Sequence, residues 1–196
     1  EESAKKELML VKRMEIEDYL AKVEEPSFLI PPHGEILVDR ILRQIPNLEY
    51  LKNLPKISLS ANQLMDAEQI AIGTFSPLDG FMGKKDLDSV LDNMRLANGV
   101  AWPLPVVLDV SRAVAGQLKE GEEVALTDGE EVVAILHLEE KYSIDKREMS
   151  EKLYSTTSEE HPGVRMVNDM GEIFLAGKID LLHRRRSQYR EYELTP

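Results

Sequence analysis

The spacing of apolar residues along the chain predicts three helices, and a capping residue, Asp145, predicts the start of a fourth. In the first three stretches apolar side chains recur every three or four residues, with charged and polar residues between them. The stretches run from about Ala4 to Glu24, from Ser60 to Ile72, from Lys84 to a stop at Asn98-Gly99, and over residues 145–153. Ser60-Ala61-Asn62-Gln63 is a capping box, which gives the second helix the clearest start in the chain.

Alternating and continuous apolar runs predict short strands between these helices. We expect strands over residues 56–59, 106–110, 124–127, 132–138 and 173–182. Asp128-Gly129 between two of them is a strong hairpin signal. Ser76-Pro77-Leu78-Asp79-Gly80 predicts a tight turn in which Gly80 takes a positive φ, residues 47–55 predict a loop, and His161-Pro162-Gly163-Val164 predicts a turn.

The composition narrows the class of protein. With 196 residues the chain can form one large domain or two small ones, and it contains no cysteine, which excludes disulfides and thiolate metal sites. A reducing, cytoplasmic compartment is the interpretation that fits. The net charge of −12 argues against nucleic acid as the main partner, and no apolar run reaches the roughly eighteen residues that span a bilayer. The charged first twenty residues do not resemble a secretory signal.

No residue of the chain is predicted to be catalytic, cofactor-binding or metal-binding. The four histidines, His33, His137, His161 and His183, lie far apart in the sequence and are expected to be turn, core or edge residues. Asp66 and Glu68 are two residues apart on one helix, so they point to different faces and are interpreted as solvated charges. The chain has neither a Walker-type glycine loop nor a His-Glu-x-x-His helix.

Several motifs keep one order along the chain. They are LIPPHGEILVDR at 29–40, KISLSANQLMDAEQIAIG at 56–73, SPLDGFM at 76–82, SVLDNMRLANG at 89–99, WPLPVVLDV at 102–110, EHPGVRMV at 160–167 and IFLAGKIDLL at 173–182. In this order and spacing they closely resemble the N-terminal domain of ATP sulfurylase, also called sulfate adenylyltransferase. The resemblance covers about Leu29 to Leu182.

The resemblance implies an α+β fold, mainly β: a PUA-like pseudobarrel of mixed, mostly antiparallel strands with peripheral helices. It divides the chain into an added N-terminal helix at 1–26, the PUA-like domain at 27–183, and a basic tail or linker at 184–196 that is expected to be solvated or to form an interface. In the family, a nucleotidyltransferase domain makes adenosine 5'-phosphosulfate and pyrophosphate from ATP, with Mg, and sulfate. Its glutamine-threonine-arginine-asparagine and histidine-x-x-histidine segments have no match here.

We therefore expect that the chain stops, near Pro196, where the catalytic domain would begin, and that this fragment is inactive alone. Its partner would be that C-terminal catalytic domain, within a homo-oligomeric parent. The assimilatory or dissimilatory direction and a fused kinase domain stay open. Alternatives are a stand-alone RNA-binding module that uses Lys178, Arg184, Arg185, Arg186 and Arg190, or a protein-interaction module. Arg95 and Arg165 are candidates to approach an anion from the side.

Overall fold

The structure is a computed structural model that describes residues 30–44, 46–185 and 187–196. Internal contacts divide the chain into Glu1–Pro31 and Pro32–Pro196, and the elements below all belong to the second unit. The helix expected over residues 1–26 lies outside the described residues, so it stays a prediction.

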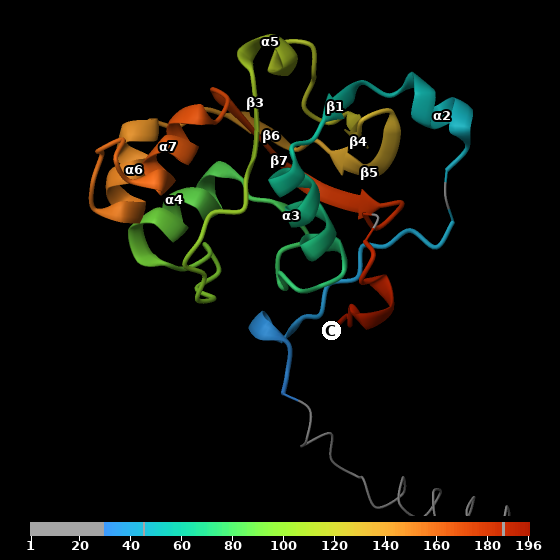
Figure 1. Ribbon diagram of the computed structural model, residues 1–196, viewed down its shortest axis with the longest axis horizontal. Coiled ribbons are helices and arrows are strands. Elements are labelled where there is room, and N and C mark those ends of the chain that lie inside the picture. Colours follow the sequence, from blue (N-terminus) through green and yellow to red (C-terminus); the bar gives the residue numbers. More distant parts are fainter. Residues whose placement is uncertain (1–29, 45, 186) are drawn as a thin grey trace, which may run out of the picture. The chain divides into compact units, whose positions relative to one another are not determined.

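The longest strand, β7 (Ile173–Leu181), is the centre of the sheet. Four strands pair with it, all antiparallel. Its first half pairs with β3 and β6, and its second half pairs with β5 and β2. These partners are β2 (Gly80–Phe81), β3 (Leu108–Val110), β5 (Glu131–His137) and β6 (Glu140–Tyr142). Figure 1 shows β7 passing through the middle of the other elements.

Beyond β5 the sheet continues to β4 (Glu123–Asp128) and then to β1 (Lys56–Ser58). β4 and β5 form the hairpin that Asp128-Gly129 predicts, and β1 joins β4 in parallel. The described residues thus form a seven-stranded mixed sheet in which one pairing is parallel and the others are antiparallel. The predicted α+β fold with mixed, mostly antiparallel strands is confirmed.

Two glycines allow β7 to change partners halfway along its length. Gly177 has a φ of 148°, and a Cβ there would lie 1.9 Å from the backbone oxygen of His137. A Cβ on Gly80 would lie 1.9 Å from the backbone oxygen of Gly177. The prediction that Gly80 takes a positive φ is wrong, because Gly80 is a strand residue that is needed for close backbone approach.

Helices lie around this sheet. They are α2 (Leu48–Asn53), α3 (Ala61–Ala71), α4 (Lys84–Asn93), α5 (Arg112–Ala115), α6 (Lys146–Tyr154) and α7 (Pro162–Asp169), with short 3-10 turns η1 (His33–Glu35) and η2 (Arg190–Tyr192). Figure 1 shows α6 and α7 together at one end of the sheet and α2 at the other. No helix of the described residues is long and apolar enough to cross a membrane.

The helix starts follow the sequence more closely than the helix ends do. Ser60 caps α3 with the predicted reciprocal bonds to Gln63, and Asp145 caps α6. However, α4 ends at Met94, which takes a left-handed φ of 53°, and Asn98-Gly99 instead lies in the following turn. Two short helices replace predicted irregular segments: Asn47 caps α2, and the His161 ring caps α7 by accepting from the Gly163 amide.

The core lies between the sheet and helices α3 and α4. Phe174, Leu175 and Ile179 of β7 are fully buried, and they share one apolar cluster with Ile70 of α3 and Leu87 of α4. Burying an aliphatic or aromatic side chain of this size contributes about 1.5–3 kcal/mol. Because β7 supplies side chains to this cluster and hydrogen bonds to four strands, its geometry determines the placement of the rest.

We expect that Gly177→Ala destabilises the domain by about 3 kcal/mol, since a Cβ 1.9 Å from a carbonyl oxygen forces backbone movement in two strands. Urea unfolding followed by tryptophan fluorescence measures this loss. The matched control is Gly116→Ala, where φ is −67° and the nearest atom to a new Cβ is 3.3 Å away. Equal midpoints for the two variants would contradict this account of β7.

Candidate functional site

The four histidines lie at separate places in the structure. His33 Nε2 is 2.7 Å from the Ala101 carbonyl oxygen, and His161 caps α7. His137 stands between two carboxylates, with Nε2 2.7 Å from Asp180 Oδ2 and Nδ1 3.2 Å from Glu123 Oε1. Within residues 30–44, 46–185 and 187–196, no group of three histidine or carboxylate side chains is placed to hold a metal ion.

The most concentrated polar cluster instead surrounds Glu68, on α3. Its side chain is only 1% exposed, and three arginines from the end of the chain reach it. Arg184 Nε donates to Oε1 at 2.7 Å, the backbone amide of Arg185 donates to Oε2 at 3.1 Å, and Arg190 Nη1 lies 3.4 Å from Oε1. A carboxylate so deeply buried requires paired, hydrogen-bonded partners, and the tail provides them.

Glu193 completes this cluster on its outer side. It accepts from Arg184 Nη2 at 3.1 Å and lies 3.4 Å from Arg190 Nη1. A hydrogen bond from Ser187, and then the charges of the three arginines, lower the pKa of Glu193. Arg190 also donates to the Arg185 carbonyl, so the tail folds back on itself. We call Glu68, Arg184, Arg185, Arg190 and Glu193 the tail cluster.

The interpretation of Glu68 as a solvated charge is wrong. Of the two expectations for the basic tail, a solvated segment or an interface, the first does not hold for Arg184, Arg185 and Arg190, and the second stays a prediction. These results share one physical cause, because the carboxylate and the guanidinium groups neutralise each other's charge. The sequence contains a signal for this. Glu68 falls one helical turn before Ala71 and Ile72, which are both buried, so it interrupts an apolar stripe opposite a run of arginines.

Asp66, on the same helix, behaves differently. It is half-buried and has no hydrogen-bond or ion-pair partner within the described part of the chain, and burial raises its pKa from 3.8 to about 6. Asp66 and Glu68 therefore do not act as a pair of carboxylates. One is a buried ion with arginine partners, and the other is a group that burial disfavours in its charged form.

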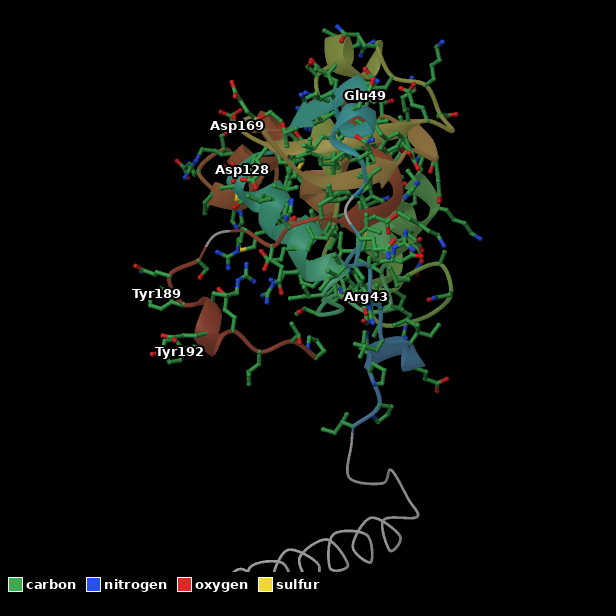
Figure 2. The ribbon with its side chains drawn as sticks, turned by 90° about the vertical axis from the view of Figure 1, so that its right-hand side faces the viewer. Arg43, Glu49, Asp128, Asp169, Tyr189 and Tyr192 are labelled. Carbon is green, nitrogen blue, oxygen red and sulfur yellow. The ribbon has the colours of Figure 1, made fainter. Side chains whose placement is uncertain are left out.

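A cavity of about 560 Å³ lies between the start of α3, the β4–β5 hairpin and the tail cluster. Asn62, Met65, Asp128, His183 and Arg185 are among its lining residues. Figure 2 shows Asp128 on this side of the molecule. The arginines at its wall already pair with Glu68 and Glu193, so the cavity offers little free positive charge to a phosphate.

The residues proposed for RNA binding are occupied in the same way. Lys178 Nζ pairs with Asp79 at 2.9 Å, and Arg184, Arg185 and Arg190 belong to the tail cluster. Arg186 lies outside the described residues. The two arginines considered for an anion also have backbone partners: Arg95 donates to the Gly99 carbonyl, and Arg165 donates to the carbonyls of residues 159 and 160. The structure does not bring these two into one site.

Comparison with known families identifies the class of protein. A family model described as "PUA-like domain" matches residues 30–184, which is most of the chain and nearly all of the described structure. The chain belongs to this PUA-like domain family. The curled, mostly antiparallel sheet built on β7 is the pseudobarrel expected of it.

Curated relatives carry one name. The chain is 44% identical over 174 residues to a sulfate adenylyltransferase of Halothermothrix orenii. The aligned region covers 86% of this chain and 45% of that protein. It is 46% identical over 159 residues to a sulfate adenylyltransferase of a Synechococcus strain, covering 79% of this chain and 40% of the relative. The chain thus spans less than half the length of these relatives.

A solved structure shows the same fold at lower identity. It is titled "Hexameric APS kinase from Thiobacillus denitrificans" and superposes with a TM-score of 0.62 at 26% identity. The match covers 85% of this chain and 30% of that one. In that solved protein, as in the two relatives above, the matched region is one part of a much longer polypeptide.

If the tail cluster fixes the end of the chain, Glu68→Gln loosens it, because a neutral amide holds three guanidinium groups and an amide poorly. We expect chymotrypsin to cleave after Tyr189 and Tyr192 about tenfold faster in this variant, as an about 1.4 kcal/mol easier local opening implies. Mass spectrometry of timed digests measures it. Glu49→Gln, an exposed change on α2 that Figure 2 locates, is the control. Identical cleavage rates would refute the role of Glu68.

The raised pKa of Asp66 gives a pH dependence with a definite sign. The folded state binds the proton more tightly than the unfolded state, so wild-type stability falls as pH rises from about 4 to about 6. Asp66→Asn removes this cost. We expect the variant to be more stable than wild type at pH 8, with the difference vanishing below about pH 4. Urea unfolding at both pH values tests this, and Asp169→Asn, an exposed change at the end of α7 (Figure 2), is the control.

Proposed function

We propose that this chain is the N-terminal PUA-like part of a sulfate adenylyltransferase, a nucleotidyltransferase of sulfur metabolism. The observation that carries the proposal is the 44% identity over 86% of the chain to an enzyme of that name. The whole enzyme would use ATP, with Mg, and sulfate, and would produce adenosine 5'-phosphosulfate and pyrophosphate. The absence of cysteine supports a cytoplasmic location.

We place the chemistry outside this chain. Adenylyl transfer requires free cations and amide dipoles around the phosphates, to neutralise charge as the pyrophosphate leaves. The arginines at the wall of the cavity beside the tail cluster are instead bound to Glu68 and Glu193. In this proposal they hold the fold together and are not available to a nucleotide.

In this proposal the domain has a structural role, which is to position the catalytic domain. The tail cluster links the segment 184–193 to α3, and α3 contributes Ala67 and Ile70 to the core. A catalytic domain that follows this segment would therefore start from a defined point and direction. Boundaries at 1–26, 27–183 and 184–196, with the last part acting as a linker, belong to this proposal.

The outer side of the tail supports a domain contact. Tyr189 and Tyr192 are 61% and 74% exposed, and Figure 2 shows both side chains pointing away from the body of the domain. Leu194 is more exposed still. Adjacent aromatic and apolar side chains on one segment are typical of a contact surface, and we propose that they pack against the catalytic domain. The relative titled as hexameric supports a homo-oligomeric parent.

The proposal predicts a division of activity. We expect sulfate-dependent pyrophosphate release from ATP by the full-length protein and none by residues 1–196 alone. A coupled pyrophosphate assay on both proteins tests this. In the full-length protein, Glu68→Gln should lower the temperature of half-inactivation while leaving the initial rate within about twofold, since Glu68 would position a domain and not touch substrate.

Glu49→Gln, on exposed α2, serves as the control for this experiment. Sulfate-dependent turnover by the isolated chain would overturn the inactive-fragment proposal. A full-length protein without that activity would overturn the enzyme assignment itself.

A further inference from the structure

A second polar cavity is lined by residues of α6 and α7. These two helices lie at the end of the sheet away from α2 (Figure 1). Its volume is about 310 Å³, and it is lined by Arg147 and Ser150 of α6, Thr157 of the connecting loop, and Val164 and Asn168 of α7. No lining residue is acidic. The neighbouring cavity beside α4, by contrast, is lined by Asp88, Asp92 and Glu148 among others.

Ser150 gives the first sign that this cavity takes a ligand. The residue is 1% exposed, and its Oγ has no hydrogen-bond partner in the chain. Leaving a buried hydroxyl without a partner is costly, so such groups in native proteins are usually satisfied by the chain, by ordered water or by another bound molecule. Since Ser150 lines the cavity, the molecule that satisfies it enters from there.

Arg147 gives the second sign. It lies one helical turn before Ser150 and is exposed, and its guanidinium group forms no ion pair or hydrogen bond with any described residue. Only its backbone amide is engaged, by the Asp145 cap. The chain has a net charge of −12. An unpaired guanidinium group beside a buried, unpaired hydroxyl is therefore a local positive site at which an anion can bind. Guanidinium groups bind the oxygens of phosphate and sulfate through paired hydrogen bonds.

The remaining polar walls are also donors. Thr157 is half-buried and contributes a hydroxyl, while Asn168 Nδ2 gives one hydrogen to Glu159 Oε1 at 3.1 Å and retains a second. The loop that carries Thr157 is fixed at its ends, because the Tyr154 and His161 rings lie against each other with centroids 4.7 Å apart. The donors are thus held in place before a ligand arrives.

We propose that this cavity binds a tetrahedral oxyanion: inorganic phosphate or sulfate, or the phosphate group of a small organic ester. Arg147 supplies the charge, and Ser150, Thr157 and Asn168 supply neutral hydrogen bonds. At about 30 Å³ per water molecule, 310 Å³ accommodates a bare ion and also part of an attached organic group. The site lies on elements remote from the tail cluster and does not depend on the function proposed above.

The test is a titration of the whole chain followed by amide nitrogen-proton NMR. The probes are sodium phosphate, sodium sulfate and glycerol 3-phosphate, each at constant ionic strength adjusted with sodium chloride. We expect saturable shifts at the amides of residues 147–150, 157 and 168, with chloride alone producing none. Tighter binding of glycerol 3-phosphate would identify the ligand as an ester, whereas equal binding would identify a free ion.

Arg147→Gln and Ser150→Ala should each weaken binding by about tenfold or more, because each removes a hydrogen bond to a charged ligand. Arg147 is at the surface, so its substitution leaves the fold intact even if Ser150→Ala does not. Arg43→Gln, which removes an 87% exposed charge paired only with Asp39, should bind as wild type does. Shifts that grow linearly with salt, or that survive Arg147→Gln unchanged, would overturn the proposal.

Discussion

The close approach of the backbone at Gly177 is the constraint on which the rest of the structure depends. There β7 passes from pairing with β3 and β6 to pairing with β5 and β2, and the carbonyls of His137 and Gly177 occupy the space where two side chains would begin. A sheet that exchanges both neighbours within one strand curls on itself. This curl brings residues of β7 into one core with α3 and α4, and it places the chain end beside α3.

The tail cluster follows from that placement. β7 ends at Leu181, and three residues later Arg184 meets Glu68 of α3. The Arg184–Glu68 ion pair alone would cost free energy of folding, because burying a carboxylate removes its hydration. With two further arginines and Glu193 it becomes a network that ties sequence-distant segments together. Such networks add geometrical definition more than raw stability, which suits the proposed role of this segment as a linker to a catalytic domain.

The sequence correctly predicted the features that depend only on residues close to one another in the chain. The Ser60 capping box, the Asp145 cap and the hairpin at Asp128-Gly129 all appear where the letters place them. The errors arise where a distant backbone decides the outcome. The close backbone approach at Gly80 could be predicted only by knowing that Gly177 lies opposite it in the sheet. The burial of Glu68 could be predicted only by knowing that Arg184, 116 residues later, pairs with it. The barrel-like arrangement of the strands was expected only from the resemblance, since periodicity does not specify which strands pair.

In so acidic a chain, the pairing of cations with carboxylates in the fold decides which cations are free to bind a ligand. Several positive side chains have carboxylate partners, as Lys178 has Asp79, Lys152 has Asp92 and Glu148, and Arg40 has Asp180. With 36 acidic residues against 24 basic ones, such pairing is expected to be common. Arg147 lacks a carboxylate partner in the described structure, and it lines the same cavity as the buried, unpaired Ser150 hydroxyl. This combination locates a site that neither the resemblance nor the tail cluster explains, because its donors are assembled only when α6 and α7 pack together.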